Sequence, residues 1–104
     1  MAQYLLLYRG GSMPETEAEQ ARVVEAWTAW FTELGGAVKD PGNPFTPASM
    51  HISADGAVSA GSSDASGYTI LEADSLDAAV ALSKGCPVLQ GGAAIDVHET
   101  FEVM

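Results

Sequence analysis

The most constraining feature of the chain is an apolar run near its start, QYLLLYR at residues 3–9, which has the length of one strand and ends at Gly10-Gly11. Alternate side chains of a strand point to opposite faces of its sheet, which here places Tyr4, Leu6 and Tyr8 on one face and Leu5 and Leu7 on the other. A strand that is apolar on both faces is typical of a central strand covered on both sides. The fold must therefore supply two covering layers.

Two segments carry the signals of helices. Ser12 followed by Glu15 resembles a capping box. Apolar side chains then recur at helical spacing until Gly35-Gly36, at Val24, Trp27, Phe31 and Leu34. A second, shorter helix begins after Ser75 and ends at Gly85. We interpret the tryptophans as core residues rather than as an aromatic binding box.

The remaining segments read as strands separated by turns. A dipeptide typical of β-hairpins, Asp55-Gly56, stands between two of them. A Pro-rich loop at 40–49 follows the earliest of these segments. The expected strands are 37–39, 50–53, 57–60, 67–73 and 95–103.

This order predicts one domain, residues 1–104, with an α+β, ferredoxin-like fold: an antiparallel sheet with two helices on one face. Two helices can cover only one face of that sheet, although the first strand is apolar on both. We therefore expect a second copy of the chain to cover the other face, in a homodimer of the α/β-barrel type.

The last strand, IDVHETFEV at 95–103, has two unlike faces. We expect Ile95, Val97, Phe101 and Val103 to pack under the helices, and Asp96, His98, Thr100 and Glu102 to border the dimer cleft. Asp96 and His98 are the candidate catalytic residues, because a carboxylate beside an imidazole suits general acid–base chemistry. The competing interpretation is a solvated strand face.

Three further residues are candidate ligand-binding groups, namely His51, Tyr8 and Tyr4. Arg9 is another pocket possibility, on the strand face opposite Tyr8. His51 follows the Pro-rich loop, and a tyrosine hydroxyl can orient a ligand. An exposed histidine and structural tyrosines are the competing interpretations. His51, His98 and Asp96 are acceptable zinc ligands by type, but the chain lacks a close metal-binding spacing. We predict no metal site and no cofactor.

The charge and the cysteine count limit the partners and the compartment. Fourteen acidic residues against four basic ones give a formal charge of -10, with no basic patch. Binding to nucleic acid or to an anionic membrane is therefore not expected. A lone cysteine, Cys86, excludes an internal disulfide, suits a reducing compartment and is interpreted as a small buried hydrophobe rather than a catalytic thiol. In the absence of a secretory segment, we expect a cytoplasmic protein.

Several stretches resemble the YCII-related family in its DGPF-type branch. They are YLLLYRG, AWTAWFTELGG with DPGNPF, GYTILEADSLDAAVALSKGCP and AAIDVHETFEV, in that order over nearly the whole chain. The resemblance implies a ferredoxin-like fold, an α/β-barrel dimer and a pocket in each subunit. The family has no settled activity. A His-Asp pair in the pocket has suggested an enzymatic role for it, and some relatives are linked with extracytoplasmic-function sigma factors.

Two departures from the family pattern affect its site. The DGPF tetrapeptide is absent, and His98 stands at about the place where relatives often carry arginine. We therefore retain three hypotheses. The first is a homodimer that binds a small molecule, with possible acid–base chemistry of a hydrolytic or proton-transfer type at His98 and Asp96. The second is a non-catalytic regulatory or interaction module associated with transcription, and the third is a structural domain.

Overall fold

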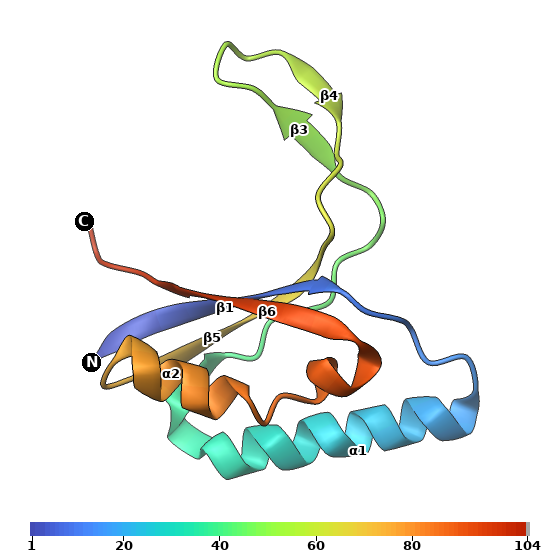
Figure 1. Cartoon of the computed structure of the whole chain (residues 1–104), viewed down its shortest axis with the longest axis vertical. Helices are drawn as coiled ribbons and strands as arrows, with labels where there is room; N and C mark the ends of the chain where they lie inside the picture. Colours follow the sequence, from blue (N-terminus) through green and yellow to red (C-terminus); the bar gives the residue numbers. More distant parts are fainter. Residues whose placement is uncertain (104) are drawn as a thin grey trace.

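The computed structural model describes residues 1–103, and these form a ferredoxin-like α+β fold. A four-stranded antiparallel sheet has the strand order β2 (Val38–Asp40), β5 (Ala65–Ala73), β1 (Ala2–Gly10) and β6 (Ala93–Glu99). Both helices lie on one of its faces (Figure 1). No helix within the described residues is long and apolar enough to cross a membrane. In chain order the elements are β1 (Ala2–Gly10), α1 (Glu17–Leu34), η1 (Gly35–Ala37), β2 (Val38–Asp40), β3 (Met50–Ile52), β4 (Val58–Ala60), β5 (Ala65–Ala73), α2 (Leu76–Ser83), η2 (Pro87–Gly91) and β6 (Ala93–Glu99).

Strand β1 is central, as its sequence predicts, because it pairs with β5 on one side and β6 on the other. Its helix-facing side chains, Tyr4, Leu6 and Tyr8, are buried. Leu5 and Leu7 point to the opposite face and are only half-buried. The first strand thus has one face covered by the chain's own helices and one that they leave uncovered.

Helix α1 begins four residues later than the predicted capping box. The Thr16 hydroxyl accepts a hydrogen bond from the Glu19 amide at 3.1 Å, and the Glu19 carboxylate accepts one from the Glu15 amide at 3.1 Å. The predicted box at Ser12 and Glu15 is wrong, because the Ser12 amide is occupied by the Gly91 carbonyl at 3.2 Å. That bond holds the β1–α1 connection beside η2.

The aromatic residues of α1 form the core beneath the sheet, as expected. Trp30 is buried and donates its indole N–H to the Leu82 carbonyl at 3.3 Å. Trp27 meets the Tyr8 ring edge-on at 5.7 Å between centroids. Val24 departs from the prediction and is 64% exposed, because the N-terminal turns of α1 extend past the strands (Figure 1).

Strand β6 ends at Glu99, four residues before the predicted end of the terminal strand. The Thr100 amide still bonds to the Gln3 carbonyl at 3.0 Å. Beyond that point β1 has almost no residues left to pair with, since it begins at Ala2. Phe101 and Val103, predicted to pack under the helices, are therefore 82% and 76% exposed.

The Asp55-Gly56 hairpin is confirmed and forms a separate two-stranded sheet from β3 and β4. We call residues 50–60 the arm. The arm rises on the side of the main sheet opposite the helices (Figure 1). It is inserted into the connection between β2 and β5, so it leaves the four-stranded order of the main sheet unchanged.

A candidate binding face on the open side of the sheet

The sheet face away from the helices, here called the open face, has an apolar centre. Leu5 and Leu7 of β1 lie there between side chains of β5 and β6, in two cross-strand rows. The rows are Tyr68–Leu7–Asp96 and Ile70–Leu5–His98. Because directly opposed side chains in an antiparallel sheet are neighbours, the open face presents four half-buried apolar groups bordered by an acid and a histidine along β6.

Arg9 binds two carboxylates at one end of this face. Its Nη2 atom lies 2.7 Å from Asp64 Oδ1 and its Nη1 atom lies 3.1 Å from Asp96 Oδ2. The three side chains remain 43% to 59% exposed. The hydrogen bonds to Asp96 and Asp64 raise the pKa of the Arg9 guanidinium, so its positive charge is fixed. Arg9 thereby links the connection before β5 to strand β6.

Asp96 and His98 lie on the same face, as their spacing predicts, but they do not form a pair within one chain. Asp96 bonds to Arg9, and within residues 1–103 no hydrogen bond joins Asp96 to His98. The His98 side chain is exposed on the open face. A single chain therefore places the two groups side by side on β6 without assembling an acid–base pair.

The β5 side of the open face is bordered by the segment that leads to the arm. Phe45 stacks on Tyr68 with ring centroids 6.0 Å apart and planes inclined by 29°. An isolated β-bridge between Pro44 and Gly67 holds this segment against β5. A hollow of about 450 Å³ lies at the base of the arm, lined by residues 44–49 together with Ser63 and Ala65.

Tyr8 and Tyr4 point to the opposite, helix-covered face. The Tyr8 hydroxyl donates to Thr69 Oγ1 at 2.6 Å, Thr69 donates to the Pro41 carbonyl at 2.9 Å, and the Cys86 thiol lies 3.7 Å from the Tyr8 oxygen. Burial raises the pKa of Tyr8 well above its ordinary value and also raises the pKa of the Cys86 thiol. Cys86 is thus a buried, neutral residue, in keeping with its interpretation as a structural one.

Tyr4 belongs to the same covered face but reaches the edge of the sheet. Its hydroxyl donates to Glu99 Oε1 at 3.2 Å. This contact explains why an acid interrupts the inward-facing residues of β6: Glu99 supplies an acceptor to a tyrosine that is otherwise 1% exposed.

His51 is distant from these residues in the fold, because it lies on β3 in the arm.

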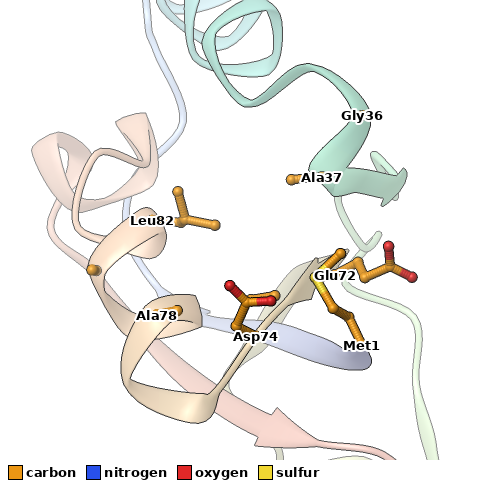
Figure 2. Close-up of a pocket in the computed structure, with 9 residues that line it drawn as sticks. Met1, Gly36, Ala37, Glu72, Asp74, Ala78 and Leu82 are labelled. Carbon is orange, nitrogen blue, oxygen red and sulfur yellow. The ribbon is translucent and has the colours of Figure 1, made fainter.

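A second hollow, of about 510 Å³, lies between α2, η1 and the end of β5. Figure 2 shows Asp74 between Ala78 of α2 and Ala37 of η1, with Glu72 and Met1 at the rim. None of the predicted site residues lines either hollow. Of those residues, the structure brings together only Arg9, Asp96 and His98, and no group of three His, Cys, Asp or Glu in residues 1–103 is placed to hold a metal.

The sequence named Arg9 as a pocket possibility on the face opposite Tyr8, and it lies on the open face. The signal for Arg9 is its position: it shares the parity of Leu5 and Leu7, so it lies on the same face of β1. Sequence reasoning missed Asp64 and Phe45 as parts of this face. Asp64 and Phe45 stand in irregular segments, where no periodicity assigns a direction to a side chain.

Comparison with known proteins establishes the fold. No protein-family model matches the chain, and no curated protein matches its sequence at a significant level. Among solved structures, the chain is similar to 5-chloro-2-hydroxyhydroquinone dehydrochlorinase (TftG) from Burkholderia phenoliruptrix AC1100, in its complex with 2,5-dihydroxybenzoquinone. The two share 20% sequence identity with a TM-score of 0.55, over 95% of this chain and 93% of that one. This chain therefore has the same α+β fold.

Proposed function

We propose that the protein is a homodimer that binds a small molecule in a cleft between the open faces of its two subunits. The observation that carries the proposal is the composition of that face. Half-buried apolar side chains occupy its centre, and Arg9, Asp96 and His98 lie along one border. Apolar surfaces rimmed by polar groups are typical of interfaces and of ligand sites.

The centre of the open face supports the dimer. Leu5, Leu7, Tyr68 and Ile70 are adjacent, and the chain's own helices lie on the other side of the sheet. Burying a fully exposed apolar side chain of this size contributes about 1.5–3 kcal/mol, and each of these half-buried side chains gains part of that when it is covered. A second copy buries the same patch on both partners at once, as two-fold symmetry requires.

The β6 border supports a ligand site. Burying a charge without a partner is costly. Arg9 and Asp96 already neutralise each other, so a second subunit can cover them without leaving an unpaired charge. His98 remains available to donate to a ligand or accept from one. TftG, in its complex with 2,5-dihydroxybenzoquinone, gives a precedent for a small-molecule ligand on this fold.

Acid–base catalysis by His98 with Asp96 is the more specific form of the proposal. A bound ligand would place its reacting proton at the imidazole of His98. The carboxylate of Asp96, which Arg9 binds, would act on that imidazole through its electric field. The contact between Arg9 and Asp96 favours the rival function, a non-catalytic regulatory module, because it engages the carboxylate that His98 would otherwise use.

We also infer membership of the YCII-related family. The ordered motifs along the chain and the ferredoxin-like fold support it. The missing DGPF tetrapeptide and the presence of His98 in place of arginine imply a site that differs from that of the relatives.

The dimer is tested by sedimentation velocity on wild-type protein and on the Leu7→Glu variant. A carboxylate at the centre of the covered face should raise the dimer dissociation constant by about a thousandfold or more. Val24→Glu is the matched control, because Val24 is 64% exposed on helix α1, on the other side of the sheet. A wild-type monomer at micromolar concentration would refute the proposal.

The site is tested by a thermal-shift screen of metabolites on wild type and on His98→Ala. A ligand of the cleft should raise the melting temperature of wild type more than that of the variant. Equal shifts remove His98 from the site. Consumption of the ligand by wild type and not by His98→Ala, followed by NMR, indicates an enzyme, whereas binding without consumption indicates the regulatory module.

A further inference from the structure

One side of the arm is apolar and uncovered. Met50, Ile52 and Val58 are 69%, 68% and 60% exposed. The register pairs Met50 with Ala60 and Ile52 with Val58, so all four lie on one side, while the His51–Ser59 pair lies on the other. We call the set Met50, Ile52, Val58 and Ala60 the arm patch.

The arm is well built internally, yet it lacks support from the rest of its own chain. At its tip the Asp55 carboxylate accepts from the Ala57 amide at 3.0 Å, and at its base the Gly61 amide donates to the Ser49 carbonyl at 3.1 Å. Its two strands pair only with each other within the described residues. A two-stranded hairpin is marginal alone in water, so its apolar side needs a partner surface.

The base of the arm is joined to the apolar surface of the open face. The Phe45–Tyr68 stack and the Pro44–Gly67 bridge fasten the base of the arm to β5. The arm then rises on the same side of the sheet as Leu5 and Leu7 (Figure 1). A molecule that covers the open face therefore also contacts the arm, at the β5 edge of that face.

From this connection we propose that the arm patch packs against a second copy of the chain, so that each subunit of the dimer holds its partner with its own arm. The inference rests on the proposed dimer, since the occupant of the arm patch is the molecule that covers the open face. The arm then belongs to the interface, and it closes one end of the cleft that the two open faces enclose.

The test compares two pairs of substitutions on the same two strands. Ile52→Ser with Val58→Ser removes one of the two apolar pairs of the arm patch, and His51→Ala with Ser59→Ala alters the opposite side of the arm. Sedimentation equilibrium measures the dimer dissociation constant of each variant. The first variant should raise it by roughly a hundredfold and the second by less than about twofold. The helical signal in circular dichroism should remain that of wild type for both, because within residues 1–103 the strands of the arm pair only with each other and lie outside the main sheet.

The outcomes separate this inference from the proposed dimer. If Leu7→Glu disperses the dimer while the arm-patch variant associates as tightly as wild type, the arm lies outside the interface and the inference is overturned. An equal loss from both pairs of arm substitutions overturns it as well, since the effect would then not depend on the apolar side. A monomeric wild type overturns both proposals.

Discussion

Arg9 Nη1 lies 3.1 Å from Asp96 Oδ2, so the carboxylate that the sequence places beside His98 is bound by a cation from the neighbouring strand. The same guanidinium holds Asp64. Arg9→Met should lower the free energy of unfolding only slightly, because exposed ion pairs contribute little and are screened by salt. Hydrogen exchange near Asp64 should nevertheless become faster. Arg22→Met, an exposed arginine of α1, is the control and should leave that exchange unchanged.

The start of α1 can be tested at two hydroxyls. Thr16→Ala removes the acceptor of the Glu19 amide and should cost about 1 kcal/mol in urea denaturation. Ser12→Ala should cost less, because the Ser12 hydroxyl makes only a 3.4 Å contact with the Gly91 carbonyl and caps no helix. A larger loss from Ser12→Ala would place the cap where the sequence first suggested it.

Buried Tyr8 and Cys86 predict a loss of stability at alkaline pH. Burial raises the pKa of both groups above their usual values of 10.0 and 9.0. The folded state therefore holds these protons more tightly than the unfolded state, and the contribution is fully present below pH 9.0. It decreases as the pH rises past the two usual values. Denaturant titrations across this range should show the decline, with a shallower slope for Tyr8→Phe, whereas constant stability to about pH 11 would contradict it.

Gly42 is expected to tolerate no side chain. Its φ is +73°, and an added Cβ would lie 1.7 Å from the Tyr68 carbonyl oxygen. Gly42→Ala should therefore cost about 3 kcal/mol or more, since both the backbone and strand β5 would have to move. Gly36→Ala has free space at its Cβ position and is the matched control. Similar denaturation midpoints for the two variants would show that the 40–49 segment adapts to the extra methyl group.

The sequence was most informative where a strand or helix has a regular period. The two apolar faces of residues 3–9 predicted a central β1, the Asp55-Gly56 pair predicted the hairpin, and the parity of β6 placed Asp96 and His98 on one face. These inferences depend only on local geometry, which the residue types determine over a few positions.

The errors arose where a contact joins segments far apart in the chain. The end of β6 is set by the residue at which β1 begins, and no pattern within 95–103 records that. The position of the helical cap depends on the bond between Ser12 and Gly91. The partner of Asp96 is likewise 87 residues away in sequence. The parity of β1 gave the face on which Arg9 lies, but its partners Asp64 and Asp96 could be assigned only once the strands were paired.

A hydrogen bond between the Gly61 amide and the Ser49 carbonyl joins the two ends of the arm. Before the arm begins, the β-bridge between Pro44 and Gly67 holds the preceding segment against β5. The register of the four-stranded sheet is thus independent of everything between those anchors. A change in the length or sequence of residues 50–60 should leave the four-stranded sheet undisturbed. The framework that carries Arg9, Asp96 and His98 is therefore insulated from sequence changes in the arm.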